Sequence, residues 1–372
     1  MKKSFLAVAI KPQSRQLLFV MTLTFIFGAC SKTSTTDMGS TDNSVPASQM
    51  KPPPPPPSPA NPAIVFNADT TFQYRGQSHT ASAIYVIDAD GSHRKLIYYD
   101  FITSGNSWSR GSTAEPEWSG NGQQICFSGR VLAGSTPPIR PLTSQTSVFT
   151  LNFSLVNGVP TASNVTKILD GAADGKSYSN PSWSPTANEI AIKAWGSSNG
   201  DPNKIQIVSS TGGTPVTIFT SPTIDFLIGQ LCFSPDGSKL AFHIRNNSTG
   251  EKWINVIDRF TGAVLNSIVL DPALGWFDLD WSRTSGSSIL IFRSFIPNSG
   301  GLGSLYQLNF NSSSTPTPLT SNAAYPTWSP DDTKIAFTES TNSQGIIKVL
   351  TLATNTITTI SLVGSYALNW KR

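Results

Sequence analysis

The segment Trp328-Ser329-Pro330-Asp331 is followed three residues later by the short apolar run Ile335-Ala336-Phe337. The same order of an aromatic residue, a polar turn and an apolar run recurs along the chain. The repeat aromatics are Trp118, Trp183, Phe233, Trp281 and Trp328, with Trp370 as a sixth. They are spaced by 65, 50, 48, 47 and 42 residues, which is typical of one propeller blade per repeat.

The pattern in each repeat predicts four short strands. The aromatic residue marks the first strand, and the apolar run marks the second. A third strand such as Ile205-Gln206-Ile207-Val208 follows, then a turn rich in Gly or Asn and a fourth strand rich in Thr and Val. Residues with β-branched side chains favour strands, and Gly and Asn accept the positive φ of tight turns. Consecutive strands joined this way predict an antiparallel meander in each repeat.

The two ends of the chain complete one blade. The unit that Trp370 opens lacks a second strand, while Ile64-Val65-Phe66 and Ile84-Tyr85-Val86-Ile87-Asp88 lack a first strand before them. We therefore expect the C-terminal strand to pair with the N-terminal blade, which removes the open edges of the ring. The prediction is an all-β fold: a six-bladed propeller of four-stranded antiparallel blades.

These segments resemble a known family. The pattern Trp-Ser-Pro-Asp followed by Ile-Ala-Phe, and the run from Ile84 to Gly91, resemble the WD40-like Pro-Asp repeat of TolB-type propellers over residues 63–372. TolB carries an additional α/β domain before its propeller, and residues 31–62 cannot form one. Relatives in the prolyl oligopeptidase group carry a hydrolase domain after the propeller, and none follows Trp370 here.

The first 62 residues predict export and tethering. Residues 1–29 combine basic residues with an apolar run of about 13 residues, which is typical of a secretory signal. Phe27-Gly28-Ala29-Cys30 resembles the lipobox of bacterial lipoproteins, which implies lipidation of Cys30. A soluble secreted protein is the alternative. Residues 30–62 read as a spacer rich in Ser, Thr and Pro, and the proline run favours polyproline II. We expect a cell-envelope protein, anchored in the outer membrane on its periplasmic or surface face.

Composition excludes several classes of function. Charged residues make up 13% of the chain, and the net charge of +4 comes entirely from the first 29 residues, which carry four basic residues and no acid. A formally neutral body gives little attraction to phosphate backbones, so no nucleic-acid partner is expected. With three histidines (His79, His93 and His243) and no Gly-x-Ser-x-Gly motif, we expect no enzyme and no cofactor.

Two acidic pairs precede repeat tryptophans and are candidates for a cation site. Glu115 and Glu117 precede Trp118, and Asp278 and Asp280 precede Trp281. In regular strands each pair would share one face and line the central channel, which makes these carboxylates candidate ligands for Ca²⁺ or Mg²⁺. Solvated acids at a channel mouth are the simpler interpretation, since two carboxylates per blade leave the shell incomplete.

The long loops offer a candidate binding surface. Loops are predicted at 98–114, 129–146, 193–203, 220–230 and 293–303, and in a meander they all emerge on one face. Trp108, Trp195 and Trp276 are all predicted in loops of this face. The candidate rim comprises these three residues with Arg110, Arg130, Phe226, Arg245, Arg293 and Phe295. Aromatic and Arg side chains suit a protein partner, and Trp also suits sugar rings; local packing is the alternative role for each.

The sequence thus predicts a monomeric, non-catalytic, lipid-anchored binding or scaffold protein whose partner is an envelope protein or a glycan. The alternative is a carbohydrate-binding protein or a polysaccharide lyase-like enzyme; a purely structural envelope protein is a third reading. Cys126 and Cys232 fall in blades too far apart to form a disulfide, so both are predicted to be buried free thiols.

Overall fold

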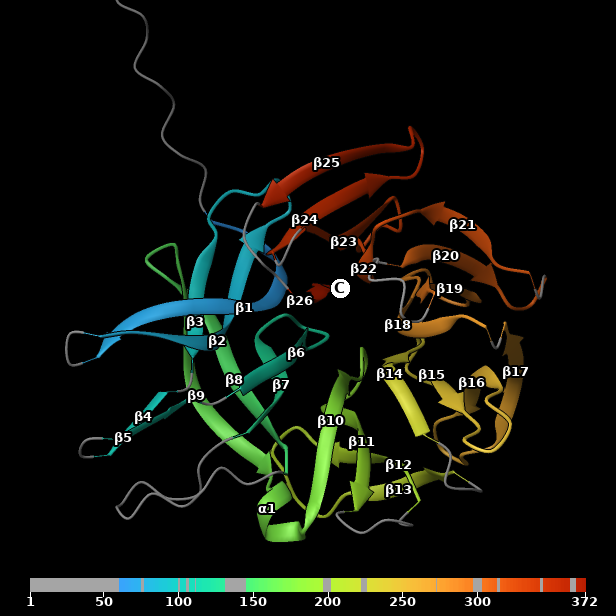
Figure 1. Cartoon of the computed structure of the whole chain (residues 1–372), viewed down its shortest axis with the longest axis horizontal. Helices are drawn as coiled ribbons and strands as arrows, with labels where there is room; N and C mark the ends of the chain where they lie inside the picture. The colour runs from blue at the N-terminus through green and yellow to red at the C-terminus, as the bar shows by residue number, and fades with distance from the viewer. Residues whose placement is uncertain are drawn as a thin grey trace, which may run out of the picture. The chain divides into compact units, whose positions relative to one another are not determined.

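Six four-stranded sheets surround a central axis in the computed structural model (Figure 1). The structure describes residues 60–372 except 75–76, 100, 105–106, 111, 131–144, 197–201, 222–225, 272, 297–302, 313–314, 342–343 and 362–365. The predicted signal, Cys30 and the proline run therefore lie outside the described residues. Within the described part, no helix is long and apolar enough to cross a membrane.

Each sheet is one blade, and its strands run from the centre of the ring outward. Blade 1 is β26 (Tyr366–Trp370), β1 (Pro62–Tyr74), β2 (Gln77–Asp88) and β3 (Lys95–Tyr99). Blade 2 is β6 (Ser112–Trp118), β7 (Gln124–Arg130), β8 (Ser147–Val156) and β9 (Val159–Leu169). Blade 3 is β10 (Lys176–Trp183), β11 (Glu189–Gly196), β12 (Lys204–Ser209) and β13 (Val216–Thr220).

The remaining three blades follow in chain order. Blade 4 is β14 (Phe226–Phe233), β15 (Lys239–Arg245), β16 (Lys252–Asp258) and β17 (Val264–Leu270). Blade 5 is β18 (Gly275–Trp281), β19 (Ile289–Phe295), β20 (Ser304–Asn309) and β21 (Thr317–Thr320). Blade 6 is β22 (Ala324–Trp328), β23 (Lys334–Thr341), β24 (Gln344–Thr351) and β25 (Thr356–Ser361). The predicted all-β six-bladed propeller is confirmed.

The repeat aromatics form the core between blades. Trp118, Trp183, Trp281 and Trp328 are at most 2% exposed, and Phe233 is fully buried. Every one of these side chains belongs to a cluster that joins residues of two neighbouring blades, as Trp281 packs with Ile254 and Val256 of blade 4. Because each fully buried apolar side chain contributes roughly 1.5–3 kcal/mol, these junctions hold the ring together.

The C-terminal strand closes the ring as predicted. β26 pairs with β1 through Ile64↔Trp370, Val65↔Asn369 and Phe66↔Leu368. Beyond the strand, the Lys371 amide donates to the Ala63 carbonyl at 2.7 Å. Figure 1 shows the C-terminus at the centre of the ring.

Several predicted loops are in fact partly strand. The segment predicted as loop 98–114 contains a hairpin of β4 (Phe101–Ser104) and β5 (Ser107–Arg110), which includes Trp108. Trp195 lies in β11 and Trp276 in β18, so the loop assignment of all three tryptophans was wrong. The strands are longer than the apolar segments that predict them, because main-chain pairing continues for two to four residues beyond those segments. A one-turn helix, α1 (Gly171–Asp174), was also not predicted; the Asp170 carboxylate caps its first amides.

A β-bulge interrupts the innermost strand of every blade. One residue in each has positive φ at the point where the pairing register shifts. These residues are Glu115, Asn180, Gly229, Asp278, Tyr325 and Ala367. Gly adopts this conformation readily and Asn and Asp are enriched in it, so three of the six positions carry backbone strain. The bulge breaks the alternation that was expected to put Glu115 with Glu117, and Asp278 with Asp280, on one strand face.

Candidate functional site

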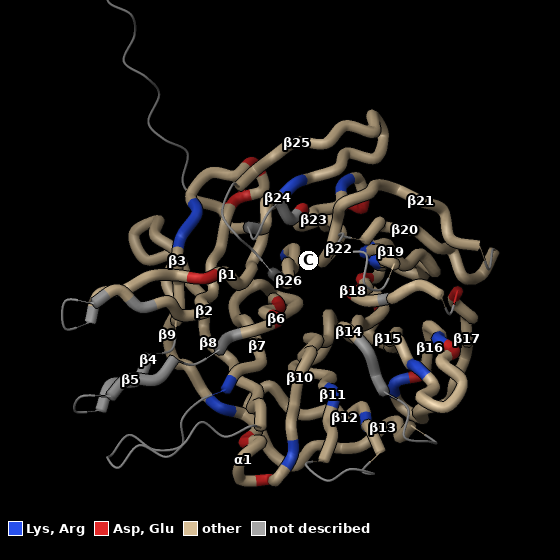
Figure 2. The backbone as a smooth tube through the Cα atoms, in the orientation of Figure 1, with Lys and Arg blue, Asp and Glu red and all other residues tan. Residues whose placement is uncertain are grey.

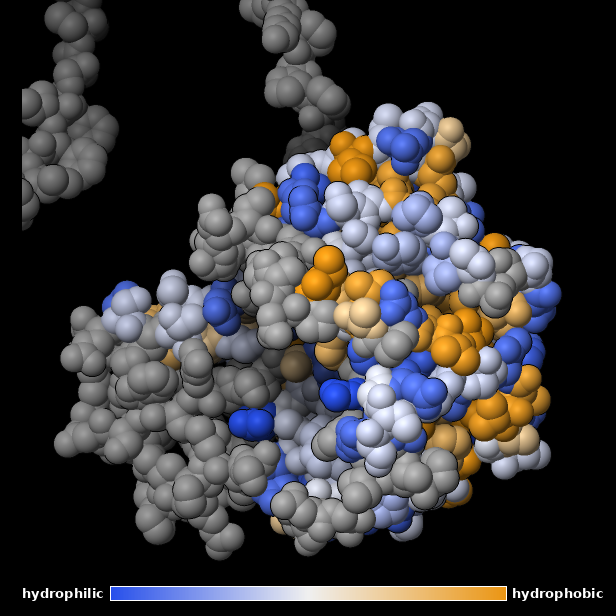
Figure 3. Space-filling view, turned by 45° about the vertical axis from the view of Figure 1, so that its right-hand side comes forward, coloured by the Kyte–Doolittle hydropathy of each residue, from blue (hydrophilic) through white to orange (hydrophobic). Residues whose placement is uncertain are grey.

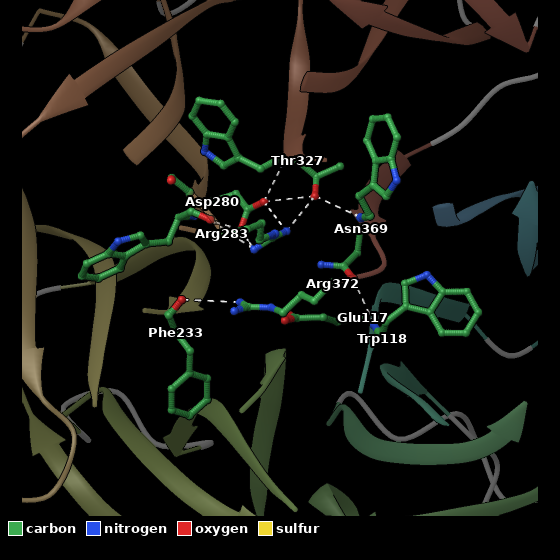
Figure 4. Close-up of polar contacts among 12 residues, drawn as sticks. Glu117, Trp118, Phe233, Asp280, Arg283, Thr327, Asn369 and Arg372 are labelled. Atoms are coloured by element: carbon green, nitrogen blue, oxygen red, sulfur yellow. Dashed lines mark hydrogen bonds and ion pairs between the residues drawn. The ribbon is translucent and has the colours of Figure 1, made fainter. Parts of the chain in front are cut away.

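Polar side chains on the innermost strands link neighbouring blades around the channel (Figure 4). The residue just before a repeat tryptophan accepts a hydrogen bond from the tryptophan amide of the next blade. Asp280 accepts from Trp328 at 2.9 Å, Thr327 from Trp370 at 3.0 Å, and Asn369 from Trp118 at 3.1 Å. Glu117 accepts the equivalent bond from Trp183. We call these four contacts the interblade latches.

The bulges carry a second set of contacts of the same kind. Glu115 accepts from the backbone and side-chain amides of Asn180, both at 2.6 Å. Asp278 accepts from the Tyr325 amide at 3.3 Å and pairs with Arg293 at the same distance. The bulge frees an amide from the ladder, and a carboxylate of the preceding blade satisfies it.

A charged cluster occupies the channel beside the latches. The Arg283 guanidinium holds both carboxylate oxygens of Asp280 at 2.7 and 2.9 Å. Arg372 reaches in from the C-terminus and donates to the Phe233 carbonyl at 3.5 Å. Burial raises the pKa of Glu117 to about 8, opposed by Arg372, and lowers the pKa of Arg372 to about 10. Figure 2 shows acidic and basic positions side by side near the centre of the ring.

The channel at this level has little free space. The cavity there is lined by inner-strand residues of all six blades, including Glu115, Glu117 and Asp280, and its free volume is about 20 Å³. That is room for one or two water molecules. A sugar or peptide does not fit between these side chains without displacing them.

All four acids considered as cation ligands accept hydrogen bonds from the next blade. Asp280 also binds Arg283, and Asp278 binds Arg293, so these two carboxylates are already neutralised. Among the residues that the structure describes, no three metal-binding side chains come together. Sequence reasoning missed the latch role, although the signal was present: a polar residue directly precedes the aromatic in most repeats.

The strand register places the rim residues along one edge of the ring. First strands start where second strands end, through the pairs Ser112↔Arg130, Ser177↔Trp195, Phe226↔Arg245 and Phe277↔Arg293. Arg130, Trp195 and Arg245 are exposed there. The side chains of Trp108, Arg110, Phe226 and Trp276 lie outside the described ones, although their backbones belong to strands.

Arg293 and Phe295 are packed together rather than free. The Arg293 guanidinium lies over the Phe295 ring at 5.0 Å while it pairs with Asp278. Phe295 in turn stacks on Phe277 with ring centroids 5.3 Å apart. These two side chains therefore stabilise the top of blade 5. Figure 3 shows exposed apolar groups as small patches among hydrophilic ones on the face in view.

His243, Cys126 and Cys232 have buried side chains, whereas His93 is half-buried. His243 is 1% exposed, and burial lowers its pKa to about 3, so the imidazole is neutral. His93 pairs with Asp88 at 2.8 Å in a turn, and the His79 side chain lies outside the described ones. Cys126 and Cys232 are buried and free, as predicted.

No model of a protein family matches the sequence, and no curated protein matches it either. Among solved structures, TolB from Acinetobacter baumannii is similar over 83% of this chain and 66% of its own, with 13% identity and a TM-score of 0.54. A putative TolB from Agrobacterium tumefaciens matches 83% of this chain and 92% of its own, with 14% identity and a TM-score of 0.49. A chain of a nidogen/laminin complex matches 84% of this chain and 99% of its own, with 12% identity and a TM-score of 0.53.

Proposed function

Since the chain is a TolB-like six-bladed β-propeller, we propose that it is a non-catalytic binding or scaffold protein of the bacterial cell envelope. Its partner is an envelope protein that docks on the rim where first strands start and second strands end. One observation carries this proposal: exposed Arg130, Trp195 and Arg245 from three consecutive blades share that edge, while the channel is filled by latch residues. Arg and Trp are enriched among the residues that contribute most of the binding energy at protein interfaces.

The second part of the proposal is lipid anchoring at Cys30 in the outer membrane. The supporting observation is the sequence Phe27-Gly28-Ala29-Cys30 at the end of the apolar run. Several acyl chains on one residue hold a protein on a membrane where one chain is marginal. Metabolic labelling with an alkyne fatty acid should mark the parent chain and leave Cys30→Ala unmarked. A Cys30→Ala protein that stays membrane-bound and labelled contradicts the anchor.

Variants at the rim test the docking face. We expect Arg130→Ala combined with Arg245→Ala to weaken crosslinking to the envelope partner at least tenfold, with thermal unfolding unchanged because both side chains are exposed. The matched control is Arg94→Ala with Phe260→Ala, since these exposed residues lie in turns on the opposite face. If the control pair loses the crosslink and the rim pair keeps it, the docking face is wrong.

A further inference from the structure

A groove follows the junction between blades 2 and 3 on the outside of the ring. It consists of two adjacent hollows of about 430 and 150 Å³, and Lys176 and Gln206 line both. The larger hollow borders the end of β9 and helix α1, and the smaller one borders Trp195 and Lys204. The groove thus reaches the rim but lies away from the central channel.

Blade 3 lacks the aromatic pair that blades 1, 2 and 5 have at one register position. In blades 1, 2 and 5 the second and third strands place two rings opposite each other: Phe66↔Tyr85, Phe127↔Phe149 and Phe292↔Tyr306. These pairs stack with centroids 5.3–6.1 Å apart. In blade 3 the same register joins Ile192 to Gln206. Gln206 thus stands beside both hollows where blades 1, 2 and 5 carry an aromatic ring.

Gln206 lines both hollows and carries an unused acceptor. The residue is 5% exposed, and its Nε2 donates to Thr217 Oγ1 at 2.9 Å. Its Oε1 is buried and has no hydrogen-bond partner among the described residues. Buried carbonyl oxygens are almost always paired, so this atom calls for a donor from a ligand. A hydroxyl group provides one.

The rim end of the groove adds a flat apolar face and positive charge. The Trp195 indole is 37% exposed and lines the smaller hollow between Lys176 and Lys204. Neither lysine forms an ion pair within the part of the chain that the structure describes. Aromatic faces take up the apolar side of a planar or ring-shaped group, and ammonium groups bind carboxylates.

We propose that the groove between blades 2 and 3 binds an oligosaccharide that contains uronic acid. One pyranose ring lies on Trp195, its carboxylate contacts Lys176 and Lys204, and a hydroxyl of the next sugar donates to Gln206 Oε1. Ligand sites of this kind typically combine an apolar surface with a small number of well-placed polar groups. This inference deepens the proposed binding role and shares Trp195 with it, so its test uses residues other than the arginines of the docking test.

The probes are β-1,4-linked tetramannuronate and β-1,4-mannotetraose, which differ only in the carboxylate at C6. Titration with calorimetric detection should show binding of tetramannuronate at least tenfold tighter than mannotetraose. Trp195→Ala should weaken it tenfold or more. Gln206→Leu should weaken it about fivefold while thermal stability is kept or raised, since the buried unpaired oxygen is gone. Lys176→Ala with Lys204→Ala should abolish the preference for the acidic probe.

Phe260→Ala is the matched control, because Phe260 is an exposed aromatic on the opposite face, 71% exposed. Binding of neither probe at 10 mM overturns the proposal, and so does binding that Trp195→Ala and Gln206→Leu leave unchanged. Equal binding of both probes overturns the assignment of an acidic sugar. If the parent protein binds neither sugar but still crosslinks to its envelope partner, the groove proposal fails and the docking proposal stands. If the Arg130→Ala, Arg245→Ala variant keeps the crosslink while the parent binds tetramannuronate, the docking proposal fails and the groove proposal stands.

Discussion

Trp370→Ala tests whether the last strand holds the ring closed. The indole is 4% exposed and packs with Ile64, Phe66 and Leu368 in one cluster. Its replacement by Ala should cost about 3–5 kcal/mol through lost burial and a cavity. Domains are stable by roughly 5–15 kcal/mol, so this single change removes a large fraction of the total.

Removal of residues 368–372 should be more severe. It also deletes the buried Leu368 side chain, the Asn369 latch to Trp118 and the hydrogen bond that the Lys371 N–H donates to the Ala63 carbonyl. The ring would then open at blade 1, and the strand edge of β1 would be exposed.

Equilibrium unfolding in urea measures both changes. With a slope of about 3 kcal/mol per molar urea for a chain of this size, Trp370→Ala should lower the midpoint by roughly 1 M or more. Val269→Ala is the control: its side chain is 69% exposed on the outer strand β17, and the midpoint should stay within about 0.2 M. A midpoint of Trp370→Ala equal to the parent's would refute the reasoning that β26 closes the ring.

Two further outcomes follow from buried groups. Burial raises the pKa of the Cys126 and Cys232 thiols, so both should resist a thiol reagent in the native protein and react after unfolding; a Cys126–Cys232 disulfide found by mass spectrometry would contradict the blade assignment. Burial raises the pKa of Glu117 to about 8 from 4.5, so the native state keeps a proton that the unfolded chain releases between these pH values. The stability this gives is complete below about pH 4.5 and is lost as pH rises toward 8, by at most about 1.4 kcal/mol per pH unit. Glu117→Gln should reduce the dependence of the urea midpoint on pH between pH 5 and 9. If the midpoint changes with pH equally in the parent and the variant, another group is responsible.

The architecture could be predicted from the sequence because the repeat consists of residue types with strong structural preferences. An aromatic residue, a turn with Pro, Asp or Gly, and an apolar strand recur at blade spacing, and each level of the pattern favours the same fold. Even the closure through Trp370 could be predicted, since one unit lacked its second strand and another lacked its first.

The site was harder to predict because its geometry depends on neighbouring blades. The bulges at Glu115, Tyr325 and Ala367 occur in residues with no preference for positive φ, so nothing local signals them. The acids were considered as cation ligands, with solvated acids as the simpler interpretation, but each accepts a hydrogen bond from an amide 47–66 residues away in sequence. The groove at Gln206 is lined by residues of two blades, so it becomes visible only once the arrangement of the blades is known.

The interblade latches do not depend on which blade contains the two chain ends. Each latch joins one blade to the next through side chain and backbone, and the junction of β26 with blade 2, through Asn369 and Trp118, is built like the others. Where β26 pairs with β1, the Lys371 amide donates to the Ala63 carbonyl, so a short peptide could join the two ends of the propeller. A circularly permuted chain, opened at the connection between blades 3 and 4, would keep every latch and every aromatic junction. The fold is thus a property of the cycle of blades, and the position of the ends within that cycle is interchangeable.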